Sequence, residues 1–301
     1  MMRAVRLHPP GGIDALSVDE VEVPQPGPGE ALVRVRAAGI TRDELDWPTD
    51  RLPAIVSYEL SGTVEEIASD VGDLAIGDDV FALTAFDRDG VAAEYAVVPA
   101  AFLASKPVGL SHVESAALPL AGLTAWQGLF AHGWLHEGER VLILGAAGGV
   151  GHLATQLARW RGAYVIGTAS TAAAELARGF GAEQVLDPAE TFAGSIEPVD
   201  VVFDTVGGEA LARSADVLRD GGRLVAVAEE PPAGLAQRVL VAYFVVEPDR
   251  EQLVELATLA AGGTLRPAID SVFPLEEAQA AFDRVMASGK RGKVVIEVDH
   301  A

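Results

Sequence analysis

The stretch Leu144-Gly145-Ala146-Ala147-Gly148-Gly149-Val150-Gly151 decides the fold of this chain. It has the spacing G-x-G-x-x-G with alanine in the first position, since Ala146, Gly148 and Gly151 stand at the required intervals. Small residues let the backbone turn tightly and let a pyrophosphate approach the N-terminus of a following helix, where free amides bind its charge. We therefore expect a dinucleotide site here, with Ala146, Gly148, Gly149, Val150 and Gly151 against the phosphates. The alternative is a glycine-rich turn that binds nothing.

The segments on either side supply the strand and the helix that this spacing needs. Residues 140–144 predict a buried strand, and residues 150–161 predict a helix with Leu153, Leu157 and Trp160 on one face. Strands and helices continue to alternate along the chain. The further expected strands are 163–168, 184–186, 200–203, 223–227 and 239–246, and the next helix is 172–179. This alternation, from about residue 116, predicts an α/β domain with a parallel, doubly wound sheet.

The N-terminal and C-terminal parts of the chain have a different pattern. Residues 1–115 contain short valine-rich runs that are broken by glycine and proline, which predict a small β-rich barrel or sandwich. The expected strands are 31–36, 61–67, 79–83 and 93–98. Beyond the α/β region, the sequence predicts a helix at about 249–262 and a final strand at 293–298.

The second expected strand of the α/β region ends where a dinucleotide ribose would bind. Proteins that bind NAD usually carry an acidic residue there, about 20 residues after the first glycine. This window is Thr168-Ala169-Ser170-Thr171, and the next acidic residue is Glu175. A carboxylate would repel a 2′-phosphate, whereas Ser170 can donate to it, so NADP is favoured over NAD, and Arg178 is a further source of positive charge. The alternative is that Ser170 only caps the following helix.

Composition excludes several classes of protein. The 301 residues suggest two domains, and the formal charge of −22 disfavours nucleic-acid binding. The chain has no cysteine, which removes disulfides, thiolate zinc sites and cysteine nucleophiles. The uncharged runs 116–135 and 141–158 are interrupted by glycine or proline, so no membrane span is expected. The first residues have no apolar signal-peptide core, and we expect a cytoplasmic protein.

Several short motifs resemble those of the zinc-independent, quinone oxidoreductase-like branch of the medium-chain dehydrogenase/reductase family. The similarity extends over nearly the whole chain. The motifs are Gly77-Asp78-Asp79-Val80-Phe81, Gly90-Val91-Ala92-Ala93-Glu94-Tyr95, Leu118–Trp126 (Leu-Pro-Leu-Ala-Gly-Leu-Thr-Ala-Trp), the fingerprint Ala146–Gly151 with Gln156, and Thr168-Ala169-Ser170. The resemblance implies a GroES-like β-barrel domain with an inserted Rossmann domain. The implied boundaries are 1–115 for the GroES-like catalytic domain, 116–248 for the Rossmann domain, and 249–301 for the return to the catalytic domain.

The same resemblance implies further contacts and an assembly. Thr124 would lie by the nicotinamide, and Val206, in the loop Asp204–Gly208, would line the cofactor ribose. Phe244 and Val245 would present backbone to the nicotinamide amide. The strand Val239–Val246 would pair across a homodimer.

Zinc divides this family, and the chain matches the branch without it. The six histidines are His8, His112, His132, His136, His152 and His300. Only His132 and His136 have a ligand-like spacing, and we interpret them as surface residues, so no metal is expected. Without a Lewis acid, a conjugated acceptor is a better substrate than a simple alcohol. Hydride adds to an electrophilic carbon, and the charge spreads onto a carbonyl or quinone oxygen.

Two family motifs are altered in this chain. The family pattern G-x-N-x-x-D is Gly39–Glu44 here, with Thr41 in place of asparagine, and we expect Thr41 to bond the substrate carbonyl. The pattern G-x-D-x-x-G is Ser57–Gly62, in which Tyr58 is expected at a cleft-facing turn as the proton donor. A packed aromatic with an exposed hydroxyl is the alternative for Tyr58. Asp43 and Glu59 are interpreted as structural, and Trp47, Phe86 and Phe244 are candidates for an apolar substrate wall or for core.

Together these observations predict an NADPH-dependent reductase of quinones or α,β-unsaturated carbonyls. Its partners would be small molecules and a second copy of the chain, with no nucleic acid and no membrane. One alternative is an enoyl reductase acting on thioesters, which would need a basic entrance that an acidic chain does not obviously supply. The other alternative is a non-catalytic NADPH-binding protein.

Overall fold

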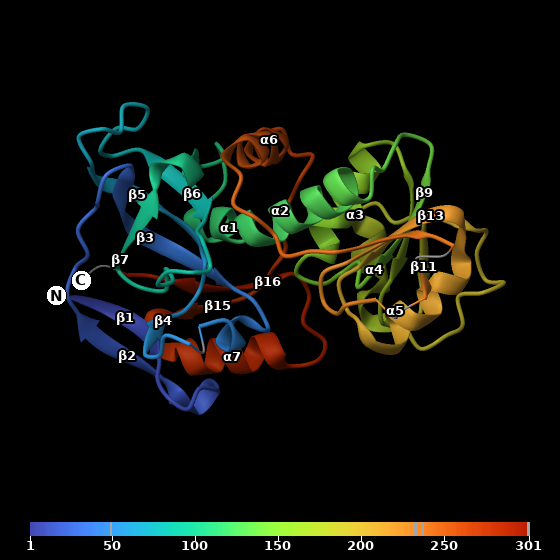
Figure 1. The fold of residues 1–301 in the computed structure, drawn as a ribbon, viewed down its shortest axis with the longest axis horizontal. Helices are drawn as coiled ribbons and strands as arrows, with labels where there is room; N and C mark the ends of the chain where they lie inside the picture. The colour runs from blue at the N-terminus through green and yellow to red at the C-terminus, as the bar shows by residue number, and fades with distance from the viewer. Residues whose placement is uncertain (49, 232–233, 236–237, 300–301) are drawn as a thin grey trace. The chain divides into compact units, whose positions relative to one another are not determined.

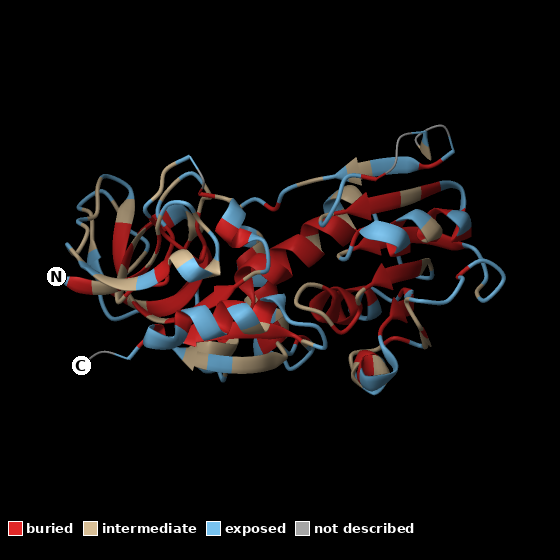
Figure 2. Cartoon of the chain, turned by 90° about the horizontal axis from the view of Figure 1, so that it is seen from below, coloured by how far each residue is buried: buried red, intermediate tan, exposed pale blue. Residues whose placement is uncertain are grey.

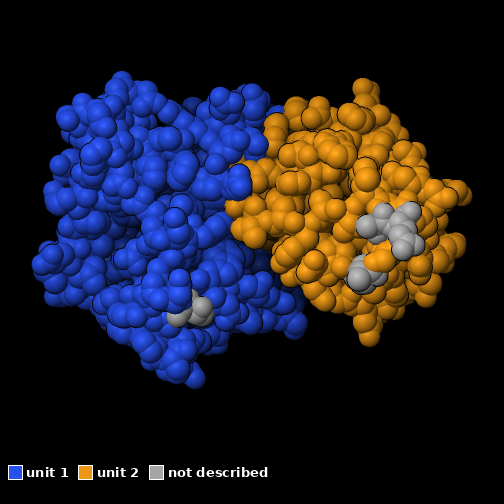
Figure 3. All heavy atoms as spheres, viewed as in Figure 1, with its two compact units in different colours: residues 1–120, 247–263, 267–301 blue, residues 121–246, 264–266 orange. Residues whose placement is uncertain are grey.

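The computed structural model describes residues 1–48, 50–231, 234–235 and 238–299, and the chain forms two compact units (Figure 3). Unit 1 comprises Met1–Leu120, Glu247–Gly263 and Pro267–Ala301, and unit 2 comprises Ala121–Val246 and Thr264–Arg266. The chain thus builds most of unit 1, then unit 2, and returns to unit 1. The functional boundaries given above, 1–115, 116–248 and 249–301, remain predictions.

Unit 1 is built on two sheets (Figure 1). The smaller has the order β2-β1-β4, and the larger has the order β15-β16-β3-β5-β6-β8, with β7 also paired to β3. The strands are β1 (Met2–Leu7), β2 (Leu16–Val21), β3 (Glu30–Ile40), β4 (Ala54–Ile55), β5 (Glu59–Ile67), β6 (Asp79–Leu83), β7 (Tyr95–Pro99), β8 (Ala104–Ser105), β15 (Ile269–Pro274) and β16 (Lys293–Glu297). The register of β16 against β3 matches Val294 with Ile40, so the C-terminal strand completes the N-terminal sheet.

Three α-helices accompany these sheets. They are α1 (His112–Ala116), α6 (Arg250–Ala261) and α7 (Ala278–Met286). Helix α1 begins at a capping box in which Ser111 and Glu114 satisfy each other's backbone amides. Helix α6 begins at Asp249, whose side chain accepts from the amide of Gln252.

Unit 2 holds a six-stranded parallel sheet with the order β11-β10-β9-β12-β13-β14. The strands are β9 (Arg140–Leu144), β10 (Tyr164–Thr168), β11 (Gln184–Leu186), β12 (Val199–Asp204), β13 (Leu218–Ala226) and β14 (Leu240–Tyr243). The helices are α2 (Pro119–Trp126), which starts in unit 1, then the π-helical η4 (Gln127–His132), α3 (Gly151–Trp160), α4 (Ala174–Gly179) and α5 (Gly208–Ser214). Numbered from β9, the order is that of a doubly wound dinucleotide-binding sheet, which confirms the predicted fold class.

The inner strands of both units are buried, red in Figure 2. Helix α3, which confirms the predicted helix, buries Leu153 and Leu157, whereas Trp160 is 42% exposed. Trp160 is the last residue of α3, and its ring stacks on Trp126 instead of entering the core. Within the described ranges, no helix combines the length and apolar character needed to cross a membrane.

Candidate active site

The predicted fingerprint lies between β9 and α3 in unit 2. Strand β9 ends at Leu144, the chain turns at Gly145 with φ +80°, and α3 begins at Gly151. A Cβ on Gly151 would lie 2.0 Å from the carbonyl oxygen of Gly145, so only glycine fits. The turn is anchored to β10, because the amide of Gly145 donates to Thr168 Oγ1 (2.9 Å) and the amide of Ala146 to the Thr168 carbonyl (2.9 Å).

The free amides at this turn fit a pyrophosphate. The backbone N–H groups of Gly149 and Val150 have no protein acceptor among the residues that the structure describes. The N-terminus of α3 has no side-chain cap, and its first turn carries no acidic residue. Unsatisfied amides at a helix N-terminus bind an anion, so the residues present match the group that the fingerprint predicts.

A second loop of unit 2 reaches the same turn. Thr205 Oγ1 donates to the carbonyl of Leu144 at 2.7 Å. Val206, 55% exposed, places its Cγ2 atom 2.7 Å from where a Cβ of Gly145 would lie. Asp204 holds this loop, because its Oδ1 accepts from the amides of Val206 (3.1 Å) and Gly207 (3.0 Å). The structure therefore brings the expected ribose residue, Val206, to the expected phosphate loop.

Ser170 follows β10 with its side chain exposed. It occupies the N-cap position of the short turn η5 (Thr171–Ala173), but its hydroxyl makes no capping hydrogen bond. The carbonyl of Ser170 accepts from Ala173, so the cap is made by backbone. Arg178 forms an ion pair with Glu175 at 2.5 Å, which partly offsets its charge.

The other predicted cofactor contacts lie elsewhere in unit 2. Thr124 is buried on α2. The amide of Phe244 donates to the carbonyl of Ala226 at 3.4 Å, and its ring packs on His132 with centroids 4.3 Å apart. Val245 is 67% exposed. Hydrogen bonds therefore connect the fingerprint turn to Thr168 and to the loop that carries Val206. The ring of Phe244 packs on His132 instead.

Unit 1 contains a buried ionic cluster around Thr41. Lys293 Nζ lies 2.5 Å from Glu59 Oε1, 3.0 Å from Thr41 Oγ1 and 3.1 Å from the Ile40 carbonyl. The Lys293 and Glu59 side chains are 4% and 1% exposed. The register of β16 on β3 explains the contact, because Lys293 follows Gly292 at the start of β16, beside the end of β3. The structure thus places the predicted Thr41 beside a cation that had no predicted role.

Glu44 completes this cluster. Its Oε2 accepts from the amide of Thr41 at 3.0 Å, and its Oε1 is buried with no hydrogen-bond partner among the described residues. Burial raises the pKa of Glu44 to about 8, against the opposing charge of Lys293. The carboxyl group of Glu44 therefore holds its proton at neutral pH, and the ion pair of Lys293 is with Glu59.

The structure corrects the expected environment of Tyr58. Its side chain is fully buried, not exposed at a turn, and its hydroxyl lies 2.7 Å from Arg51 Nη2. Trp47 and Phe86 pack on its ring with centroid distances of 5.5 and 5.3 Å. Burial raises the pKa of the Tyr58 phenol, although Arg51 opposes this. The ring is packed as in the alternative, but the hydroxyl is not exposed, because it accepts from Arg51. The role of Tyr58 as proton donor remains a prediction. Trp47 and Phe86 thus share one cluster in unit 1, while Phe244 belongs to unit 2.

The histidines form no metal centre in the part of the chain that the structure describes. No group of three His, Cys, Asp or Glu side chains lies close enough there to hold an ion. His300 lies outside the described residues. His136 lines a hollow of about 570 Å³ with Glu137, Trp160 and Arg161. That hollow is at the amino end of β9, whereas ligands of doubly wound sheets bind at the carboxyl ends of the strands.

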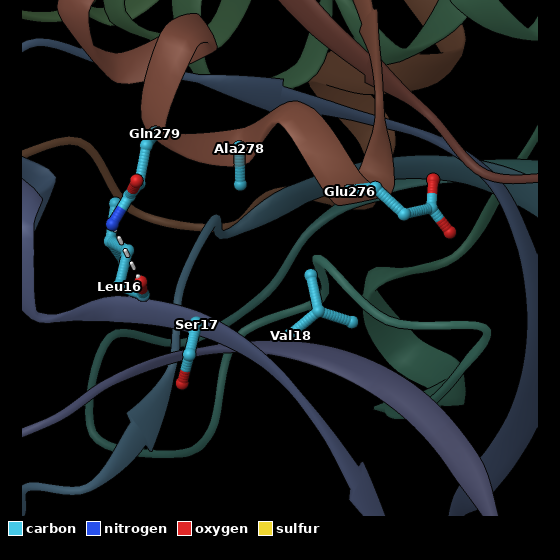
Figure 4. A pocket seen from close by; sticks show the side chains of 6 residues that line it. All are labelled: Leu16, Ser17, Val18, Glu276, Ala278 and Gln279. Atoms are coloured by element: carbon cyan, nitrogen blue, oxygen red, sulfur yellow. Dashed lines mark hydrogen bonds between the residues drawn. The ribbon is translucent and has the colours of Figure 1, made fainter.

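A second hollow lies in unit 1 and contains none of the predicted site residues. It has a volume of about 260 Å³ and is lined by Leu16, Ser17, Val18, Glu276, Ala278 and Gln279 (Figure 4). The Gln279 side chain donates to the Leu16 carbonyl across it at 3.0 Å. This bond ties α7 to β2, so the hollow reflects packing between these two elements.

Sequence reasoning missed Lys293 and Glu44 and treated Glu59 as structural. One signal was available for Lys293: it is one of only three lysines in the chain, and it opens the apolar strand Val294–Ile296. A charged residue at the start of a buried strand needs a buried partner. Nothing in the local sequence identifies that partner as Glu59.

Comparisons with known proteins agree on one family. A family model described as "Alcohol dehydrogenase GroES-like domain" matches residues 27–108, and one described as "Zinc-binding dehydrogenase" matches residues 180–296. The chain is 34% identical to "2-methylene-furan-3-one reductase" of Solanum lycopersicum, over 95% of this chain and 76% of that protein. It is 32% identical to "NADPH-dependent alkenal/one oxidoreductase, chloroplastic" of Arabidopsis thaliana, over 95% of this chain and 77% of that protein. The solved quinone oxidoreductase from Coxiella burnetii superimposes with a TM-score of 0.91 at 32% identity, and the match covers 99% of each chain.

Proposed function

The chain belongs to the medium-chain dehydrogenase/reductase family, in its zinc-independent, quinone oxidoreductase-like branch, and on that premise we propose that it is an NADPH-dependent reductase of quinones or α,β-unsaturated carbonyls. Membership makes it an oxidoreductase with a nicotinamide cofactor. The single observation that carries the choice of reaction is the Thr41 hydroxyl, which is held by a buried cation at the end of β3. A donor of this kind serves a substrate in which charge develops on oxygen.

The proposed roles follow from the residues described above. Gly149 and Val150 bind the pyrophosphate through their amides, Ser170 donates to the 2′-phosphate, and Thr41 donates to the carbonyl oxygen. Bound NADPH would supply a hydride. For an enone, the hydride adds to the β-carbon, the C=C electron pair moves to the carbonyl as an enolate, and a proton from solvent completes the saturated product. Thr41 stabilises the oxygen as its charge grows.

The test is a titration followed by a turnover assay. We expect NADPH to bind at micromolar levels by fluorescence, more tightly than NADH, and to be oxidised with 1,4-benzoquinone or 3-penten-2-one. Tighter binding of NADH would contradict the role of Ser170. Binding without oxidation across a panel of quinones and enones would favour the non-catalytic alternative. Failure to bind either dinucleotide would overturn the proposal.

A homodimer through β14 belongs to the same proposal. This strand is the edge of the unit 2 sheet, and its Leu240 and Tyr243 side chains are 55% and 49% exposed. An edge strand with exposed apolar residues can pair with a second copy. A monomeric sedimentation coefficient would contradict this assembly. A cytoplasmic location also remains a prediction.

A second candidate function has a specific observation in its favour. Arg42, Lys290 and Arg291 have no ion-pair partner in the described part of the chain, although its net charge is −22. Asp270, which accepts from the backbone amide of Arg291 at 2.8 Å, is held by Nε and Nη2 of Arg284 at 2.6 and 2.7 Å. Burial and the charges of Lys293 and Arg42 lower the pKa of Lys290 to about 8. Arg42 directly follows Thr41, and Lys290 and Arg291 precede β16, which pairs with β3, so we propose that these cations could receive the phosphates of a thioester substrate.

Charge neutralisation separates the two candidates. In the double variant Arg42→Gln/Arg291→Gln, we expect kcat/KM for crotonyl-CoA to fall about tenfold, because two of the proposed phosphate-binding cations are lost, while 3-penten-2-one is unaffected. Added salt should weaken only the wild-type reaction with crotonyl-CoA. The matched control is Arg159→Gln, an exposed arginine in unit 2. Equal effects on both substrates, or none, would remove the thioester candidate.

A further inference from the structure

We propose that Lys293 is a positioning residue that fixes the Thr41 hydroxyl as a donor toward the substrate oxygen. In this chain, which lacks cysteine, the Thr41 hydroxyl would polarise the substrate carbonyl. The buried Lys293–Glu59 pair would place a charged group next to that hydroxyl. This inference rests on the proposed function and names a further part of its site.

The direction of the hydrogen bonds carries the argument. An ammonium group has three hydrogens and no lone pair, so it can only donate. Lys293 Nζ has three oxygens around it, those of Glu59, the Ile40 carbonyl and Thr41. Nζ donates to the Ile40 carbonyl and to Thr41 Oγ1, and its contact with Glu59 Oε1 is an ion pair. Because an ammonium group cannot accept, the Thr41 hydroxyl accepts from Lys293. The single hydrogen of Thr41 is left to point elsewhere.

Burial makes this arrangement strong and rigid. Both members of the ion pair are almost fully buried, so water does not screen the ammonium charge next to Thr41. Glu59 is held from the other side by the amide of Leu120, which donates to its Oε2 at 2.8 Å. Gly39 leaves room for the carboxylate, because a Cβ there would lie 2.6 Å from Glu59 Oε1.

The backbone fixes the remaining geometry. The amide of Thr41 donates to Glu44 and its hydroxyl accepts from Lys293, so both groups of Thr41 are tied to the cluster. The hydroxyl of Ser57, which has φ +67°, donates to the Gly39 carbonyl at 2.8 Å and braces the end of β3. A hydroxyl that already accepts from an ammonium group keeps its hydrogen available for a ligand atom that accepts, such as a carbonyl oxygen. Preorganised donors of this kind stabilise developing negative charge.

The test removes the ion pair without leaving a buried charge alone. Lys293→Met by itself leaves the Glu59 carboxylate buried without a counter-charge and is expected to misfold. The variant to be measured is therefore Lys293→Met/Glu59→Gln, in which the glutamine side chain still accepts from the amide of Leu120. Thr41→Val is made in the wild type and in this variant. Thermal unfolding confirms that each protein is folded, and kcat and KM are measured with 1,4-benzoquinone and 3-penten-2-one at saturating NADPH.

We expect Thr41→Val to lower kcat about 100-fold in the wild type, with a smaller change in KM, as for the loss of one oxyanion donor. The paired variant should lower kcat at least about tenfold, and Thr41→Val should then cost less than about threefold more, because the two changes act through one hydrogen bond. Lys106→Met, at a lysine bonded to the Leu110 carbonyl, is the matched control and should leave kcat unchanged.

Three outcomes would overturn the inference. A folded Lys293→Met/Glu59→Gln variant with wild-type kcat would show that the pair has only a structural role. An equal cost of Thr41→Val in both backgrounds would show that Lys293 does not act through Thr41. If wild-type protein reduces no member of the panel, the proposed function itself fails, and the positioning role falls with it.

Discussion

We expect the replacement of Gly151 by alanine to raise the Kd for NADPH at least about 100-fold, because no space is available for the added methyl group. Its Cβ would lie 2.0 Å from the Gly145 carbonyl oxygen, 2.7 Å from the carbonyl carbon and 3.1 Å from Ala146 Cα. All three are backbone atoms, so no side chain can rotate away. Either the turn after β9 or the start of α3 must move.

The turn is the part that binds the cofactor, which is why a structural change there costs affinity. Two hydrogen bonds to Thr168 hold Gly145 and Ala146 in place, and a displaced turn would break them. The amides of Gly149 and Val150 would then lose the positions from which they reach a pyrophosphate. The effect is read by titrating NADPH fluorescence, with circular dichroism to show that unit 2 stays folded.

Gly179→Ala is the matched control for Gly151→Ala. Gly179 ends α4 in the same unit, and a Cβ there would meet nothing within 4 Å. Alanine in a helical position without a clash is neutral or slightly stabilising, so its Kd should equal that of the wild type. A Gly151→Ala protein that binds NADPH normally would show that the fingerprint is a turn without a ligand.

The sequence predicts the features that depend on local spacing. The fingerprint and the alternation of strands and helices can be recognised in short segments, and the sheet orders confirm the resulting fold class. The return of residues 293–298 to the first domain is implied by the family resemblance, and the pairing of β16 with β3 agrees with it. The need for glycine at position 151 can be recognised for the same reason, because a side chain there would clash with Gly145, only six residues earlier. Local sterics leave a local signature.

The buried cluster in unit 1 leaves no such signature. Lys293 meets Glu59 only because β16 pairs with β3 and β3 pairs with β5, and that register is a tertiary property. The environment of Tyr58 was mispredicted for a related reason. Its burial depends on Trp47, Phe86 and Arg51, which come from loops whose packing the motif does not specify.

Glu44→Gln is expected to remove a pH-dependent loss of stability. Burial raises the pKa of Glu44 from 4.5 to about 8, so the folded protein keeps this proton where the unfolded chain has lost it. Between those two values the unfolded state binds fewer protons, and stability falls as pH rises, by at most about 1.4 kcal/mol per pH unit. The loss sums to a few kcal/mol and levels off above the folded pKa. Glutamine cannot ionise, and its amide oxygen can still accept from the Thr41 amide.

Other groups that titrate in this range differ in sign and cancel in the comparison with wild type. The pKa of His112 is lowered by burial, which makes stability rise with pH below about 6.5, and the lowered pKa of Lys290 acts only above about 8. Burial raises the pKa of Asp204 above its ordinary value of 3.8, which acts in the same direction as the raised pKa of Glu44. Because Glu44→Gln leaves these groups in place, the difference between the variant and the wild type isolates Glu44.

The measurement is urea unfolding of both proteins at pH 5, 6, 7 and 8. We expect the free energy of unfolding of Glu44→Gln to rise relative to that of the wild type at each step. Only the folded wild type must either ionise a buried carboxyl group or keep a proton that the unfolded chain releases more easily as the pH rises. Glu66→Gln, on the exposed part of β5, should shift stability equally at all four values. Parallel curves for wild type and Glu44→Gln would mean that Glu44 ionises normally, and the cluster around Lys293 would then carry a second negative charge at neutral pH.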